Sequence, residues 1–146
     1  MTATSTFDPG LVLHVPILMY HRIATPAEAG ESLPGLVVAP TLFAAQLSLL
    51  ARAGWHTIIL ATLQAGLAAG RRPPPRTFVI TIDDGHRDGL TNGLPILQEF
   101  GFVATYFVIM GRIHDSQYLG PADLQVLASA GMEIADHTMS HVDLIN

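Results

Sequence analysis

The stretch that decides the fold is TFVITIDDG, residues 77–85. Its first six residues are all β-branched or aromatic, a composition that predicts a strand buried on both faces. The strand runs directly into the acidic turn Asp83-Asp84-Gly85. Two adjacent carboxylates at the end of an apolar strand repel each other and lose solvation, so a cation or hydrogen-bond donors must stabilise them. The alternative is an ordinary Asp-Gly turn in which both carboxylates stay solvated.

Strands and helices alternate on both sides of this stretch. Further strands are predicted at residues 14–20, 55–60, 103–109 and 132–136, and helices at residues 41–53, 62–69, 94–100 and 121–130. Thr41 is the expected N-cap of the first helix, and a glycine follows each helix as a stop signal. Continuous apolar strands separated by helices predict a parallel α/β sheet covered by helices. The pattern fits two architectures. One is an open doubly wound sheet, and the other is part of a closed (β/α) barrel, which needs about eight strands.

Polar residues stand at the carboxyl ends of these strands, where parallel α/β folds place their functional sites. A second group is HTMSH, residues 137–141. Its two histidines are four residues apart, which predicts that both imidazoles lie on one face of a helical turn. Together with one carboxylate they make a three-ligand set with open positions, the composition of a catalytic metal site. A chance pair of surface histidines remains the alternative.

Composition excludes several classes of protein. The chain has 146 residues, which suits one domain. With 49% hydrophobic and 13% charged residues it is not intrinsically disordered. Seven arginines and no lysine face twelve acidic residues, and this formal charge of −5 argues against nucleic acid as a partner. The absence of cysteine excludes disulfides and thiolate chemistry.

No stretch of the sequence approaches the ~20 apolar residues that a membrane-spanning helix needs. The N-terminus, MTATSTFDPG, has no basic segment ahead of an apolar run, so no signal peptide is visible.

The chain resembles the polysaccharide deacetylases, carbohydrate esterase family 4, with a NodB-like domain. TFVITIDDG is similar to that family's first motif, TFDDG, and GMEIADHTMSH at residues 131–141 is similar to its second, H-(S/T)-x-x-H. VPILMYHRI at residues 15–23, followed by a helix, resembles the circularly permuted subgroup that acts on poly-N-acetylglucosamine.

The resemblance implies a distorted (β/α) barrel and a metal-dependent hydrolase that removes N-acetyl groups from a glycan such as poly-N-acetylglucosamine, chitin-like oligomers or peptidoglycan. It implies Asp83 as general base, His21 as general acid, and Asp84, His137 and His141 as ligands of one divalent ion. Zinc is the first expectation, with cobalt, nickel or iron as alternatives. An oxyanion donor is expected at a backbone N–H near Tyr106 or Met110. The competing functions are an O-acetyl esterase and an inactive glycan-binding or assembly module.

The sequence also departs from the family pattern. The family's later motifs, an arginine that orients the base and aromatic residues of the acetyl pocket, have no counterpart before Asn146. We therefore expect a single domain, residues 1–146, that is truncated at its C-terminus and leaves its barrel incomplete. A second copy or a missing C-terminal segment would complete it. His86 replaces the usual tyrosine and is expected to influence Asp83, while Asp136 is expected either to orient His137 or to cap the turn. The family is often exported or associated with the cell envelope.

Overall fold

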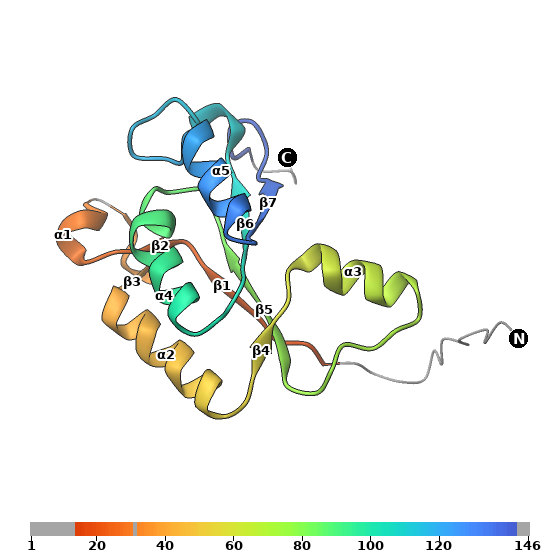
Figure 1. The fold of residues 1–146 in the computed structure, drawn as a ribbon. Helices are drawn as coiled ribbons and strands as arrows, with labels where there is room; N and C mark the ends of the chain where they lie inside the picture. Colours follow the sequence, from red (N-terminus) through yellow and green to blue (C-terminus); the bar gives the residue numbers. More distant parts are fainter. Residues whose placement is uncertain (1–13, 31, 143–146) are drawn as a thin grey trace, which may run out of the picture.

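The computed structural model describes residues 14–30 and 32–142. Its five-stranded sheet consists of β1 (Ile17–Tyr20), β4 (His56–Thr57), β5 (Thr77–Ile82), β6 (Thr105–Val108) and β7 (Glu133–Asp136). The order is β1-β5-β6-β7, and β4 pairs with the first two residues of β5 (Figure 1). Every pairing in this sheet is parallel, so the predicted α/β fold is confirmed.

The strand register aligns the polar residues that follow the strands. Tyr20 pairs with Ile82, and Ile82 pairs with Tyr106, so these strands reach the same edge of the sheet in step. One residue further on, the Asp83 N–H donates to the Tyr20 carbonyl at 2.9 Å. His21 and the acidic turn are therefore brought to one edge by the sheet itself.

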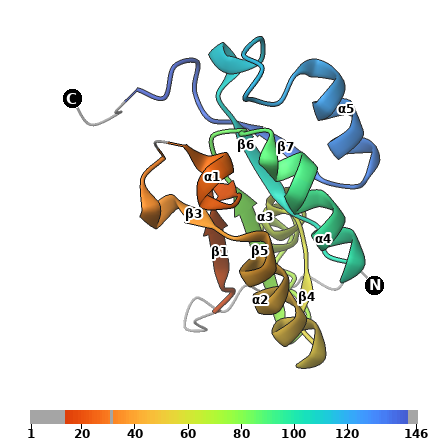
Figure 2. The same ribbon diagram turned by 90° about the vertical axis from the view of Figure 1, so that its left-hand side faces the viewer.

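Most helices cover one face of this sheet. They are α1 (Pro26–Ala29), α2 (Pro40–Arg52), α4 (Leu94–Glu99) and α5 (Pro121–Ser129), which Figures 1 and 2 show on the side opposite to α3 (Leu60–Ala68). Phe43 and Leu47 of α2 and Leu97 of α4 are fully buried in the same hydrophobic core as Ile80 and Tyr106 of the sheet. This core keeps the strands in register, because apolar burial contributes roughly 25 cal/mol per Å².

Helix α3 lies on the other face and is held there by side chains of the sheet. The Leu60 N–H donates to Thr105 Oγ1 at 3.1 Å, and the Ala61 N–H donates to a Glu133 carboxylate oxygen at 3.2 Å. The Thr105 hydroxyl in turn donates to that oxygen at 2.7 Å. These contacts replace the cap that the N-cap residue, Ile59, does not supply.

The same face is open at β1. Ile17 and Met19 of this edge strand are 52% and 63% exposed, whereas Thr105 of β6 is fully buried. At Thr105 this face is covered by α3, whose Leu60 N–H bonds to the Thr105 hydroxyl.

Several short elements complete the described chain. They are the parallel pair β2 (Arg22–Ile23) and β3 (Val37–Val38), the 3₁₀ turns Pro34–Leu36 and Met110–Arg112, and a π-helical turn at Gly89–Gly93. The sequence signal for α1 is Thr25 followed three residues later by Glu28, and the two form a capping box.

Three local expectations are wrong. Thr41 is not an N-cap, because α2 begins one residue earlier at Pro40, whose fixed φ suits the first helical position. The strand expected at residues 55–60 is shorter, because Ile58 makes the last bond to β5, at Phe78, and α3 then begins. Residues 137–141 form a turn and not a helix. None of the described helices has the length and apolar character needed to cross a membrane.

Replacing Tyr106 by Phe should lower the free energy of unfolding by about 1–2 kcal/mol. The buried Tyr106 hydroxyl donates to the Gly89 carbonyl at 2.9 Å and so ties β6 to the π-helical turn. Tyr20→Phe removes the same atom from an exposed bond to Gln46 and should change stability by less than about 0.5 kcal/mol. Urea unfolding measures the stability of both variants. An equal loss of stability in the two would show that the buried bond of Tyr106 contributes no more than the exposed bond of Tyr20.

Candidate metal centre and active site

The acidic turn after β5 has an unusual backbone. Asp84 has φ +70° and Gly85 has φ +74°, both in the left-handed region. Aspartate tolerates this region better than most residues. Gly85 is also crowded, because a Cβ there would lie 3.0 Å from Val108 Cγ1. The chain therefore turns sharply at Asp84 and packs the turn against β6.

The histidine loop after β7 is held by its own side chains. The Asp136 carboxylate accepts the Thr138 N–H at 3.2 Å, and the Thr138 hydroxyl oxygen accepts the His141 N–H at 2.9 Å. Of the two roles expected for Asp136, the structure gives it the capping one. Thr138 and His141 have φ of +65° and +57°. This conformation is strained for a β-branched threonine, and the hydrogen bonds hold it.

The loop is also joined to the turn that follows β6. The Met110 N–H donates to the Thr138 carbonyl at 3.1 Å, and the Gly111 N–H donates to the Met139 carbonyl at 2.8 Å. A Cβ at Gly111 would lie only 2.3 Å from that Met139 oxygen, so the approach requires glycine. The Met110 N–H is engaged in this bond, and an oxyanion donor at another backbone N–H near Tyr106 or Met110 stays a prediction.

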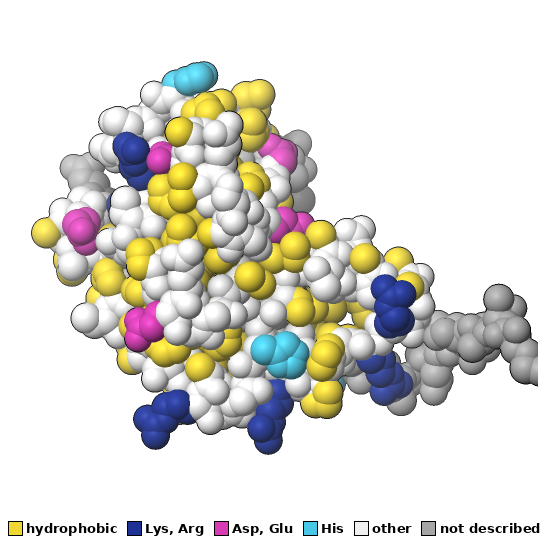
Figure 3. Space-filling view, viewed as in Figure 1, with side chains coloured by type: hydrophobic (Ala, Val, Ile, Leu, Met, Phe, Trp, Pro, Cys, Tyr) yellow, Lys and Arg dark blue, Asp and Glu magenta, His cyan; other side chains and the backbone are white. Residues whose placement is uncertain are grey.

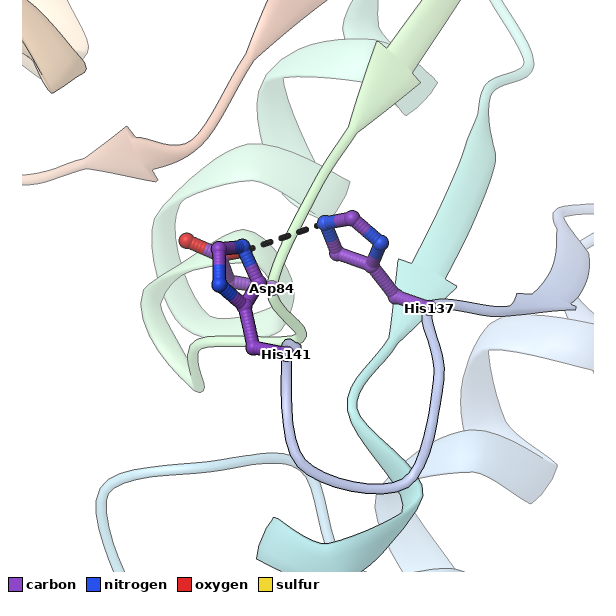
Figure 4. Close-up of side chains that lie close together, drawn as sticks. All are labelled: Asp84, His137 and His141. Atoms are coloured by element: carbon purple, nitrogen blue, oxygen red, sulfur yellow. Dashed lines mark ion pairs between the residues drawn. The ribbon is translucent and has the colours of Figure 1, made fainter. Parts of the chain in front are cut away.

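Asp84, His137 and His141 come together despite the missing helix (Figure 4). One oxygen of Asp84, Oδ1, lies 3.3 Å from Nε2 of His137 and 3.3 Å from Nε2 of His141. The candidate ligand atoms all lie within 4.8 Å of one another. Two atoms bound tetrahedrally to one zinc ion at about 2.0–2.1 Å would lie about 3.3–3.4 Å apart.

The state of Asp84 Oδ1 supports a cation at this point. The atom is buried and has no hydrogen-bond partner. A carboxylate oxygen facing two imidazole nitrogens needs positive charge between or on them. Two imidazoles and one carboxylate are also the donor types that zinc takes in catalytic sites. The three residues therefore fit one divalent ion.

Asp83 lies beside this set and is not part of it. Burial raises the pKa of the Asp83 carboxyl, and the neighbouring Asp84 adds to this, while charge on His21 and His137 and a hydrogen bond from Thr81 lower it. Asp83 Oδ1 is buried without a hydrogen-bond partner. Asp83 is therefore a carboxylate free to accept a proton, with His21 close enough to affect its charge.

His86 packs beside the acidic turn. Its ring stacks on Tyr118 with centroids 4.5 Å apart, and its Nδ1 is buried without a hydrogen-bond partner. Burial, followed by the charge of Arg22, lowers the pKa of the His86 imidazole. His86 is not among the groups that shift the Asp83 pKa, so the expected influence on Asp83 is not found.

The described arginines near the site are engaged elsewhere. Arg22, Arg87 and Arg112 form ion pairs with Asp88, Asp123 and Asp115 respectively. On the face drawn in Figure 3, most of the dark blue arginine surface lies along the lower and right-hand margin of the molecule. No described arginine is ion-paired with Asp83.

Comparison with known proteins identifies the family. A family model described as polysaccharide deacetylase matches residues 70–146, more than half of the chain, and includes the acidic turn and both histidines. The chain belongs to the polysaccharide deacetylase family. Among curated proteins, this polysaccharide deacetylase chain is 31% identical over 130 residues to "Putative polysaccharide deacetylase YxkH" of Bacillus subtilis (strain 168).

Solved structures agree with the family fold. The deacetylase PplD of Streptococcus pyogenes, solved in complex with acetate, matches 89% of this chain with a TM-score of 0.77 and 30% identity. BC0361, a polysaccharide deacetylase from Bacillus cereus, matches 89% with a TM-score of 0.74 and 26% identity. The chain spans 44% of YxkH, 58% of the PplD chain and 40% of the BC0361 chain. The circularly permuted subgroup stays a prediction.

Replacing Gly111 by Ala should weaken metal binding by about tenfold or more, because the histidine loop must move away from the new methyl group. Chelator competition with Zn²⁺ and Co²⁺ measures the affinity. His141→Ala, which removes a ligand, sets the scale for full loss of the site. Gly35→Ala is the matched control, since a Cβ there meets nothing within 4 Å. Wild-type affinity in the Gly111 variant would show that the loop is not held in this way.

Proposed function

We propose that this chain carries the metal and proton-transfer groups of a hydrolase that removes N-acetyl groups from a glycan. The observation that carries the proposal is the free carboxylate of Asp83 next to the Asp84, His137 and His141 set. His21 follows β1 at the same sheet edge, and its positive charge lowers the pKa of the Asp83 carboxyl. A ligand set, a base and an acid are the groups that amide hydrolysis needs.

The comparisons support the reaction class. Membership in the polysaccharide deacetylase family favours an acetylated glycan as substrate. PplD was solved with acetate, and acetate would be one product of the proposed reaction. Poly-N-acetylglucosamine, chitin-like oligomers and peptidoglycan all present an N-acetyl amide. The proposed activity is therefore hydrolysis of a carbon–nitrogen bond outside the peptide class.

Each residue has one task in the proposed mechanism. The divalent ion, when bound by Asp84, His137 and His141, would polarise the acetyl carbonyl and acidify a water molecule. Asp83 takes a proton from the attacking water molecule while the oxygen of the water forms a bond to the carbonyl carbon. His21 gives a proton to the amide nitrogen as the carbon–nitrogen bond breaks. The products are acetate and the free amine of the sugar.

The same groups would act on an O-acetyl ester with one difference. An ester oxygen leaves with much less help from an acid than an amide nitrogen does. An enzyme that relies on His21 is therefore best suited to the amide, and the ratio of amide to ester hydrolysis reports on that residue.

Asp83→Asn should keep the metal and lose about 10²–10⁴-fold in turnover, because it removes the general base. Asp84→Asn should instead weaken metal binding, because it removes a ligand. Metal content after dialysis and deacetylation of a chitooligosaccharide, with and without chelator, measure the two effects separately. If both variants lost metal and activity together, the division of roles would be wrong. A metal-loaded wild type with no activity on amide or ester would favour a glycan-binding or assembly module.

We also propose that a second copy or a further segment covers the open face at β1. Ile17 and Met19 are exposed there, and the chain spans only 44% of YxkH and 58% of the PplD chain. Light scattering of the purified chain should report a species larger than its 15.6 kDa monomer, or aggregation. A monodisperse monomer with full activity would refute this proposal.

A further inference from the structure

No hydrogen bond among the described residues holds the His21 side chain, although the proposed reaction needs it near Asp83. Its position must therefore be set by the backbone on either side. On one side, the Tyr20 carbonyl accepts the Asp83 N–H at 2.9 Å. On the other side, β2 begins at once with Arg22 and Ile23.

Both residues of β2 donate hydrogen bonds to one carboxylate, that of Asp88. Asp88 Oδ1 accepts the Ile23 N–H at 2.9 Å, and Asp88 Oδ2 accepts Arg22 Nε–H at 2.5 Å. Asn92, one turn further along, donates its amide N–H to the Ile23 carbonyl at 2.8 Å. The π-helical turn after the acidic motif thus satisfies both backbone groups of Ile23.

The ion pair is well shielded from water. The side chains of Arg22 and Asp88 are 12% and 9% exposed. The Arg22 guanidinium also donates to the Ser32 hydroxyl at 2.8 Å. A buried, fully bonded pair has one geometry, because any shift would leave a desolvated charge without a partner.

Asp88 also follows the acidic turn at a short, fixed distance along the chain. It stands four residues after Asp84 and is the N-cap of the turn Gly89–Gly93. Gly89 is packed tightly, since a Cβ there would lie 3.0 Å from the Tyr106 ring. The segment from Asp84 to Asp88 is therefore anchored at both ends.

We infer that Asp88 and Arg22 are positioning residues that set His21 against Asp83. This inference rests on the proposed function for the roles of His21 and Asp83. We call Arg22 of β2, together with Asp88 and Asn92, which hold β2 in place, the clamp. In the described hydrogen bonds the clamp contacts neither the proposed metal ligands nor the proposed base. Its loss should therefore impair the acid step and leave the metal site in place.

The kinetic test compares amide and ester substrates. Asp88→Asn should lower the turnover of a chitooligosaccharide by about 10²-fold, the cost of a displacement of about 1 Å, and that of an activated aryl acetate by less than about threefold. His21→Ala should show the same preference, and the double variant should lose no more than His21→Ala alone. Equal losses on both substrates, or losses that multiply in the double variant, would overturn the inference.

A second measurement does not depend on activity. In the Co²⁺-loaded full chain, proton NMR signals of the His21 imidazole should be shifted by the nearby paramagnetic ion. Asp88→Asn should change or broaden those signals while the signals of His137 and His141 persist. Unchanged His21 signals in the Asp88 variant would refute the positioning role of the clamp. Inactivity of the wild type on every glycan would count against the proposed function, and the NMR result would still decide the inference.

Two further variants guard against a general loss of structure. Asp123→Asn breaks the neighbouring ion pair with Arg87, which is 52% exposed, and should behave as wild type in both measurements. If Asp88→Asn does not fold, Asn92→Ala removes the bond to the Ile23 carbonyl together with the interaction of Asn92 with the exposed Glu28 carboxylate. It should still lower turnover of the amide more than that of the ester, by about threefold to tenfold. A loss on both substrates alike in that variant would contradict the inference.

Discussion

Strand β5 is the element on which the rest of the structure depends. All six of its residues are buried, and among the described strands it alone pairs with three others, β1, β4 and β6. A strand of this kind cannot slide by one residue without turning its core-facing side chains to the opposite face. The acidic turn at its end therefore has one fixed position, and the carboxyl ends of β1 and β6 lie beside it.

The site is assembled from loops that the sheet edge alone does not determine. Backbone hydrogen bonds join the histidine loop to the turn after β6, and glycines stand where that turn meets the histidine loop and where the acidic turn meets β6. Three of the four described non-glycine residues with positive φ, Asp84, Thr138 and His141, belong to these loops. Strain of this kind persists only where the surroundings over-determine it, and here it places three ligand atoms around one point.

The sequence predicted the parallel α/β arrangement, and two histidines with one carboxylate as a metal set, because both depend on local patterns. The choice of Asp84 over Asp83 as the ligand came from the resemblance to the family motif. Alternation of apolar strands and helices needs no knowledge of distant contacts, and a carboxylate after one strand with two histidines after another indicates a shared edge. The errors came from tertiary contacts. The spacing of His137 and His141 suggested a helix, but a turn is held instead by the N–H groups of Met110 and Gly111 and by the Asp136 carboxylate, which accepts the Thr138 N–H. The cap of α3 by Thr105 and Glu133 is likewise invisible to a reading of neighbouring residues.

The left-handed conformation of Thr138 would link the binding of an ion at the proposed site to the ordering of the histidine loop. A β-branched residue in this region costs about 1–3 kcal/mol, which is recovered only while the loop keeps its bonds and its ligands stay together. Ion and loop conformation then form one reciprocal equilibrium: the ordered loop raises the affinity for the ion, and the ion raises the population of the ordered loop by the same factor. Loop residues such as Met139, which is 68% exposed, should accordingly be cut more slowly by a protease as the ion concentration rises.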